Sequence, residues 1–277
     1  MAELKLSEGE KCYLINGIND NFRIDGRSCW DRREIELENN LLPSCVGSAL
    51  IRSVNCSVIA GVKMSLVSPD SGRPGKGKIE FFADISANAD PLFEGRGGQE
   101  MTVELVRFFE DSFKDCSLLD CLTVVEGKQV WCLSIDILIL EIGARASLYD
   151  LCSIAVKAAL YDTRLPKVYF NPDIMDIEIS EDPFDLMQLD VSKVPIFVTV
   201  TRIGNNYTID PTQEEEASSI ASLLFSVDNC GTLLHSKKLG HGSLHCYPIK
   251  ELIPKISEVA LELHNFIDDQ CKSFTSR

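Results

Sequence analysis

Alternation of hydrophobic and polar positions predicts several β-strands in the first half of the chain. Strands are expected at about 34–38, 48–55, 57–66 and 79–86, with a turn near Asn55. A nearly continuous apolar run at 131–141 is typical of a strand that is covered on both faces.

Other stretches repeat their apolar residues at helical spacing. Residues 1–20 predict a short helix or arm, and a helix at about 99–113 has an apolar stripe. A wide apolar arc predicts a buried helix that opens at Ser147, with Asp150 as a weak capping box. A last helix ends the chain. The stripe of the 99–113 helix is Met101, Leu105, Phe108, Phe109 and Phe113, and that of the last helix is Ile249, Leu252, Ile253, Ile256, Ala260, Leu263 and Ile267.

The order of these elements predicts two consecutive units. The stretch 171–192 holds seven acids and no Lys or Arg, which indicates a connecting segment. Strands follow near 196–203, 207–210, 219–227 and 233–238, before the last helix. We therefore expect an arm at 1–20, a first domain at 21–170, an acidic connector at 171–192 and a second domain at 193–277. Strands followed by helices in each unit predict an α+β fold, with helices packed on mixed or antiparallel sheets.

Composition agrees with a soluble globular protein. The 277 residues are 45% apolar and 25% charged, enough to bury a real core. The apolar run at 135–142 is too short to cross a bilayer, and Met1-Ala2-Glu3-Leu4-Lys5 has no apolar signal core. We therefore expect the chain on the cytosolic or nuclear side, with no membrane contact.

Charge restricts how this chain can meet nucleic acid. The formal net charge is −15, and the acids are spread evenly over both halves. Because affinity for phosphate is largely electrostatic, the bulk surface opposes RNA. An RNA role needs a local basic patch, or one that other subunits complete.

Cysteines and histidines predict no metal site. The eleven cysteines are odd in number and contain no Cys-x-x-Cys pair, so we interpret them as reduced, mostly core residues. His235, His241 and His245 lie close in sequence, but their stretch lacks acids, and a turn before the last helix explains it better than zinc.

The densest cationic feature is Arg23-Ile24-Asp25-Gly26-Arg27, followed by Asp31-Arg32-Arg33. Four arginines thus fall within eleven residues, just before a predicted strand. A guanidinium there suits a phosphate, or a carboxylate of a neighbouring element or subunit. An internal arginine–carboxylate network that ties down the N-terminal segment fits these residues equally well.

This arginine stretch resembles the entry to the first strand in the RNase PH family, particularly the RNase PH-like ring subunits of the eukaryotic RNA exosome. The resemblance extends over about residues 8–268. Four further stretches carry it: Phe93-Glu94-Gly95-Arg96-Gly97-Gly98 with Glu104 and Arg107; 138–145; 154–164; and Ile209-Asp210-Pro211-Thr212 with Glu214-Glu215-Glu216. It is strongest to the non-phosphorolytic class, which pairs with the class that bears the phosphate site.

The resemblance implies an α+β fold of two RNase PH-like units. It also implies a hetero-hexameric ring of related chains, RNA-binding cap subunits, single-stranded RNA and a separate 3′→5′ exoribonuclease as partners, with no cofactor. It implies localisation in the nucleus, the nucleolus and the cytoplasm. Arg96, Arg107 and Arg145 are then RNA-channel candidates, and Arg23, Arg27 and Arg33 are structural or interface arginines.

Departures from the family pattern bear on catalysis. Phosphorolytic members need a Gly-rich loop that ends in Ser/Thr-Arg and a pair of acids. Here Gly143-Ala144-Arg145 lacks the hydroxyl that donates to phosphate. Asp185 and Asp190 are present, but the position of the second family acid falls near Val194-Pro195, which can neither bind metal nor move a proton. On the 99–113 helix we interpret Asp111, like the nearby Lys114, as part of a solvated mixed-charge face.

We therefore expect no catalytic residue and a structural role in the exosome ring, lining the RNA path. The alternative is an active phosphate-dependent exoribonuclease, with Arg107 and Arg145 holding phosphate and Asp185 or Asp190 assisting. A third possibility, a protein-interaction module unrelated to RNA, requires the arginine loops to be internal salt bridges.

Overall fold

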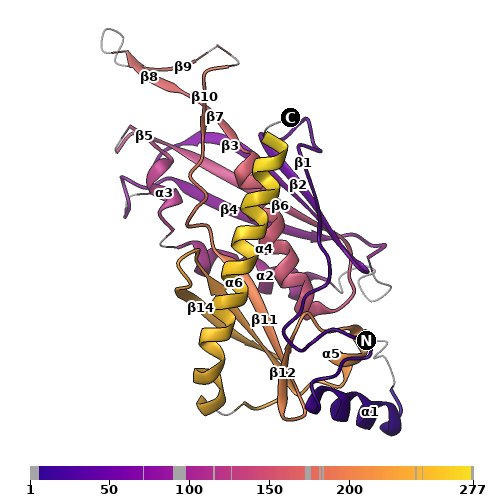
Figure 1. Cartoon of the computed structure of the whole chain (residues 1–277). Helices are drawn as coiled ribbons and strands as arrows, with labels where there is room; N and C mark the ends of the chain where they lie inside the picture. Colours follow the sequence, from indigo (N-terminus) through magenta and orange to yellow (C-terminus); the bar gives the residue numbers. More distant parts are fainter. Residues whose placement is uncertain are drawn as a thin grey trace.

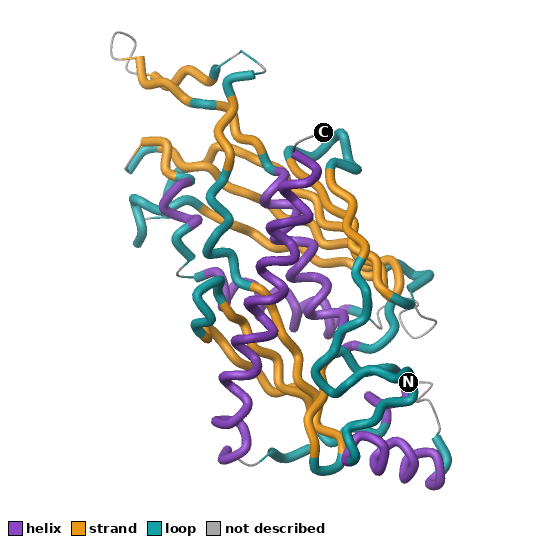
Figure 2. Tube along the Cα trace, in the orientation of Figure 1, coloured by secondary structure: helices purple, strands orange, loops and turns teal. Residues whose placement is uncertain are grey.

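The first unit is built on a mixed, six-stranded sheet. The structure is a computed structural model that describes residues 6–70, 72–89, 98–114, 116–125, 127–171, 176–180, 182, 184–240, 242–244 and 246–275. The strand order is β1-β2-β3-β6-β4, and β5 also pairs with β6 (Figures 1 and 2). Only β4 runs parallel to its neighbour. The strands are β1 (Glu36–Asn39), β2 (Gly47–Ser53), β3 (Cys56–Val67), β4 (Lys78–Ile85), β5 (Thr123–Val125) and β6 (Gln129–Glu141).

The second unit is a four-stranded antiparallel sheet in the order β12-β11-β13-β14. Its strands are β11 (Ile196–Ile203), β12 (Asn206–Ile209), β13 (Ala221–Val227) and β14 (Leu233–Leu239). The helices are α1 (Glu8–Asn19), α2 (Gln99–Phe113), α3 (Leu118–Cys121), α4 (Arg145–Asp162), α5 (Gln213–Ala217) and α6 (Cys246–Thr275).

Helix α4 joins the two units. It contacts β2 and β3 of the first sheet and β11 of the second, and α6 packs beside it (Figure 1). Every residue of α4 from 146 to 160 is buried, which explains why its apolar residues cover such a wide arc. Sheets, helices and their order confirm the predicted α+β fold of two β-rich units.

A buried polar contact links α4 to α6. Lys157 Nζ lies 2.7 Å from His264 Nδ1 and 3.1 Å from Asp268 Oδ1, while His264 Nε2 lies 3.2 Å from the Val227 carbonyl oxygen. A carbonyl only accepts, so Nε2 carries the ring proton and Nδ1 accepts from Lys157. Burial, reinforced by the charge of Lys157, lowers the pKa of His264 to about 4.

The segment expected to be a plain acidic connector contains strands. β8 (Val168–Asn171) pairs with β9 (Asp176–Ile179), and β10 (Leu186–Gln188) pairs with β7 (Arg164–Pro166). Figure 1 shows β8 and β9 projecting from the body as a hairpin. The alternation Asp176-Ile177-Glu178-Ile179 suits a strand despite its acidity. The domain limits at residues 20, 170 and 192 stay a prediction.

Three sequence-based expectations are wrong in detail. Helix α4 begins at Arg145 with Ala144 as N-cap, and Asp150 binds elsewhere instead of capping it. β6 is covered on both faces only in its first half, since Leu138 is 37% exposed. On α6, Ile253 is 38% exposed because it lies at the margin of the helical stripe.

Candidate functional site

Asp210, just after β12, is the point where the N-terminal arginines meet. Arg33 Nε donates to Oδ2 at 2.9 Å, Arg27 donates to Oδ2 at 3.0 Å, and Ser147 Oγ donates to Oδ1 at 2.7 Å. Burial alone would raise the pKa of Asp210, but the hydrogen bonds and charge of Arg33 outweigh it and hold that pKa well below its usual value. Asp210 is therefore a permanent carboxylate that ties the N-terminal segment to α4.

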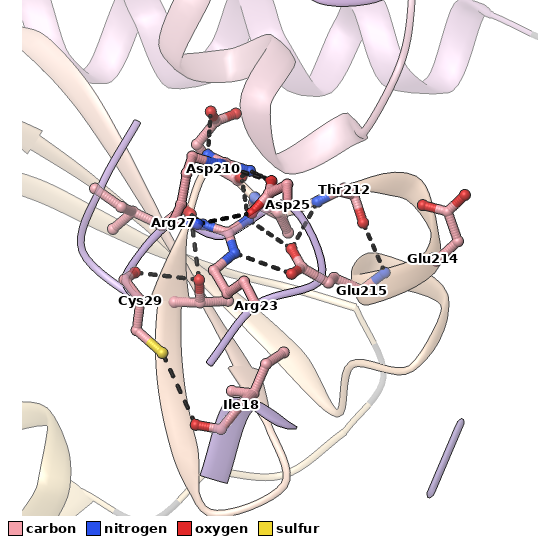
Figure 3. A network of polar contacts seen from close by, with 12 residues as sticks. Ile18, Arg23, Asp25, Arg27, Cys29, Asp210, Thr212, Glu214 and Glu215 are labelled. Atoms are coloured by element: carbon pink, nitrogen blue, oxygen red, sulfur yellow. Dashed lines mark hydrogen bonds and ion pairs between the residues drawn. The ribbon is translucent and has the colours of Figure 1, made fainter. Parts of the chain in front are cut away.

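Arg23 forms a second, deeper ion pair. Its Nε and one terminal nitrogen donate to the two oxygens of Glu215 at 2.9 and 2.6 Å, and its guanidinium also donates to the Ile209 and Asp210 carbonyls (Figure 3). Arg23 is 1% exposed. Glu215 is fixed in turn by a capping box with Thr212, whose backbone N–H donates to it at 2.8 Å.

These contacts show what the arginine-rich stretch does in this chain. Arg23, Arg27 and Arg33 bind carboxylates and carbonyls of the second unit, and Arg32 binds the fully buried Asp150 of α4. Thr199 Oγ1 also donates to Asp150, at 2.7 Å. The internal network is thus the arrangement present, and these guanidinium groups are occupied by it.

The Gly143-Ala144-Arg145 loop is closed by an acid from the second unit. The Glu216 carboxylate of α5 accepts the backbone N–H groups of Arg145 at 2.7 Å and Ala146 at 3.2 Å. Unpaired N–H groups at a helix N-terminus favour anions such as phosphate. Here a side chain of the protein occupies that position. Burial raises the pKa of Glu216, and the two N–H donors offset this only in part.

The backbone of the Gly143-Ala144-Arg145 loop has little room to adopt another conformation. A Cβ added at Gly143 would lie 3.0 Å from the Asn55 carbonyl oxygen in the β2–β3 turn, and Gln213 Nε2 donates to the Gly143 carbonyl at 3.1 Å. The loop is therefore held between the first sheet and α5.

The side chain of Arg145 forms no ion pair with an acid of the described residues. Asp150 pairs with Arg32, and no part of the described chain forms a hydrogen bond or ion pair with the half-buried Arg145 guanidinium. Burial raises the pKa of Glu216 and of Tyr149, and the nearby charge of Arg145 offsets this only in part. Arg145 is thus a cation beside the closed loop.

Tyr149 connects this loop to α2. Its hydroxyl donates to Glu104 Oε2 at 3.4 Å, and Lys237 of β14 lies 3.0 Å from Glu104 Oε1. Arg107 is exposed one helical turn beyond Glu104. The structure thereby brings together the helices that carry Arg107 and Arg145, whereas Arg96 lies outside the described residues.

The two candidate acids have local partners. Asp185 accepts from Lys167 Nζ at 2.6 Å and from the Tyr169 hydroxyl at 2.7 Å, beside the projecting hairpin. Asp190 accepts the backbone N–H of Ser192 at 3.0 Å, and Val194 is fully buried.

Metal-ligating side chains do not gather in the part of the chain that is described: no group of three or more His, Cys, Asp and Glu residues could hold an ion. His235 packs on Phe108 and lies 3.9 Å from Asp111, while His241 and His245 are outside the described residues. No disulfide joins the ten cysteines whose side chains the structure describes. Among the described helices, none is both long and apolar enough to span a membrane.

Sequence reasoning missed Glu216 as the residue that closes the loop. A signal existed nearby, because Thr212-x-x-Glu215 is a capping-box pattern that predicts a helix start. Nothing local indicated that the next residue would reach the start of α4, 70 positions away in the chain.

Comparison with known proteins covers both units. Residues 31–166 match domain 1 of the 3′ exoribonuclease family (RNase PH), and residues 193–253 match domain 2. The exosome complex component Rrp42 of Thermococcus kodakarensis is 31% identical over 93% of this chain and 92% of its own length. The protein of the same name from Sulfurisphaera tokodaii is 31% identical over 85% of this chain and 84% of its own.

Solved structures agree over nearly the whole length. A chain of an archaeal exosome core has a TM-score of 0.77 and 26% identity, covering 94% of this chain and 97% of that one. A chain of the Archaeoglobus fulgidus exosome with RNA bound to the active site has a TM-score of 0.76 and 26% identity, covering 95% and 98%.

Proposed function

The chain belongs to the 3′ exoribonuclease (RNase PH) family, and from this membership we propose that it is a structural, non-catalytic subunit of an RNA exosome core ring. Relatives that carry the name exosome complex component Rrp42 align with both units over nearly their full lengths. The fold of this chain, in which α4 contacts both sheets, resembles that of a chain of an archaeal exosome core over nearly its whole length.

The observation that carries the non-catalytic part of this proposal is the Glu216 contact. A phosphorolytic site must present N–H groups and a hydroxyl to inorganic phosphate. In this chain the N–H groups of Arg145 and Ala146 already bind the Glu216 carboxylate, and Ala144 has no hydroxyl. A phosphate would have to displace a carboxylate of like charge.

The acids support the same reading. General acid–base or metal work needs a carboxylate within reach of the reacting atoms. Asp185 is engaged by Lys167 and Tyr169, Asp190 by Ser192, and Val194 offers only a buried hydrocarbon side chain.

The proposed role in guiding RNA rests on cations that have no partner within the described chain, and not on the paired arginines. The exposed Arg107 and the half-buried Arg145 are placed on neighbouring helices, where each guanidinium is suited to a phosphate without reading a base. We assign Arg96 to the same path. The partners in this proposal are RNase PH-like ring chains, RNA-binding cap subunits, single-stranded RNA and a separate exoribonuclease. The proposed localisation is the nucleus, the nucleolus and the cytoplasm.

The decisive experiment determines what co-purifies with the full chain from cell extract and what the chain does alone. We expect other RNase PH-like chains in the complex, and no phosphate-dependent release of nucleoside diphosphates by the isolated protein. Release that Arg145→Ala abolishes would instead establish the phosphorolytic alternative. Recovery with no RNase PH-like chain would support an interaction module unrelated to RNA.

A further inference from the structure

Helix α1 is packed against the body by only a small part of its surface. Its buried residues, Leu14 and Ile18, include one member of a small hydrophobic cluster separate from the main core. In that cluster Ile18 packs with Cys29 and Ile203, and Ile15 lies against them. Figure 1 shows α1 at one end of the molecule, away from the main sheets. The opposite side of the helix therefore has no cover from the described chain.

A groove lies beside α1, where the exposed Tyr13 adjoins the buried Leu14 and Ile18. It has a volume of about 350 Å³ and runs between α1 and the extended residues that follow it. Three large apolar side chains that line it are mostly exposed: Tyr13 at 64%, Phe22 at 61% and Ile24 at 64%. Large apolar side chains that gather around one concavity mark an interaction site more often than isolated ones do.

The groove is built by specific local geometry. After α1 the chain turns back through Asn21, which has a left-handed φ of 57°, and the Phe22 N–H donates to the Gly17 carbonyl at 2.8 Å. A Cβ on Gly17 would lie 2.9 Å from the Phe22 carbonyl oxygen, so the close return needs glycine. The ion pair between Arg23 and Glu215 fixes the chain segment that follows Phe22.

Charge indicates the kind of occupant. The groove contains one buried cation, Arg23, and the bidentate pair with Glu215 neutralises it. Of the residues that line the groove, the exposed charge is Asp20, and the acids Glu8 and Glu10 lie outside the lining, in the first turn of α1. A carboxylate beside apolar walls opposes RNA and favours basic side chains.

We propose that this α1 groove binds an apolar segment of a partner protein that carries Lys or Arg on its flanks. Apolar side chains of that segment fill the space between Tyr13, Phe22 and Ile24, and its cations face Asp20 and the first turn of α1. The inference does not depend on the exosome assignment, because it rests on this groove alone.

The test places a photo-crosslinker in the groove of the full-length protein in cells. Tyr13→p-benzoylphenylalanine retains an exposed aromatic ring, and Phe184→p-benzoylphenylalanine, at a side chain 92% exposed on another surface, is the matched control. We expect the Tyr13 probe to link to one protein segment that contains large apolar residues flanked by Lys or Arg. Ile24→Ser or Asp20→Lys should each reduce that product at least fivefold, while the recovered amount of the full-length protein stays unchanged.

Other products would overturn the proposal. These are a link to RNA, to residues 1–5 of this chain, to a second copy of it, or to an acidic or wholly polar segment. A crosslinking yield equal to that of the Phe184 control would also overturn the proposal. So would a yield that Ile24→Ser and Asp20→Lys leave unchanged. Since Ile24 and Asp20 are exposed, these variants leave the core intact, and circular dichroism of the purified chain verifies that.

Discussion

The Glu216 carboxylate accepts a 2.7 Å hydrogen bond from the backbone N–H of Arg145, so an acid of the second unit occupies the start of α4. The same carboxylate also accepts from Ala146. The N-terminus of α4, which favours a bound anion, is thus a contact point between the two units.

Removing this carboxylate should expose the anion position. Glu216→Ala leaves two N–H groups without their acceptor, and we expect the free energy of unfolding to fall by about 1 kcal/mol. Inorganic phosphate should restore part of that loss in the variant and leave the wild type unchanged. Urea unfolding with phosphate or chloride at equal ionic strength measures both effects. Glu214→Ala, at an exposed acid of the same helix, is the control. An equal phosphate effect on all three proteins would contradict this.

Among the acids that bind the N-terminal arginines, Asp210 should be the one whose substitution lowers the free energy of unfolding most. Asp210→Asn keeps the size of the side chain and tolerates the left-handed φ of 45°, but it leaves Arg33 and Arg27 without their shared charge. We expect a loss of about 3 kcal/mol in the free energy of unfolding. Glu38→Gln, which breaks the exposed pair with Arg52, should cost less than about 1 kcal/mol. Similar urea midpoints for the two variants would show that the network does not stabilise the fold.

His264 should make stability depend on pH. Its pKa is about 4 in the folded protein against 6.5 for an ordinary histidine, so the unfolded chain binds the extra proton between these values. The stabilisation is complete above about pH 6.5 and is lost as the pH falls towards 4. Between pH 7.5 and pH 5 we expect the free energy of unfolding to decrease by about 2 kcal/mol from this residue. The measurement is the difference in that decrease between the wild type and His264→Gln. Parallel pH profiles would exclude His264 as the source.

Arg145 should affect RNA retention and not chemistry. Arg145→Ala in the assembled complex removes a cation with no hydrogen-bonded partner in the described chain, and RNA binding should weaken by about 1–3 kcal/mol. Single-turnover RNA degradation at saturating enzyme should keep its rate. Arg52→Ala, at an exposed arginine of β2, is the control. A rate loss of roughly a hundredfold, equivalent to about 2.7 kcal/mol, would place Arg145 in the chemical step.

Local patterns predicted most of the elements. The stripe from Met101 to Phe113 gives the bounds of α2, and Asn55, with φ of 58°, forms the turn expected between β2 and β3. These features depend on spacing and on turn chemistry, which a sequence displays directly. The acidic hairpin strands were overlooked because the charge of 171–192 hid a short alternating run.

Long-range pairing was beyond such patterns. Asp150 was expected to cap α4, yet it is fully buried against Arg32, 118 residues away, and Glu216 takes the capping position. The pairing of acids with arginines depends on how the two sheets pack on α4. From the local sequence alone, each acid could pair with any of several cations.

The Arg23–Glu215 pair has a consequence for how the protein is made. Its two residues are 192 positions apart in the chain. At a synthesis rate of about 5–20 residues per second, Arg23 is made roughly 10–40 seconds before Glu215 exists. During that interval the Arg23 guanidinium lacks the carboxylate that it binds in the finished protein. The buried position of Arg23 can therefore form only after the second unit has been made.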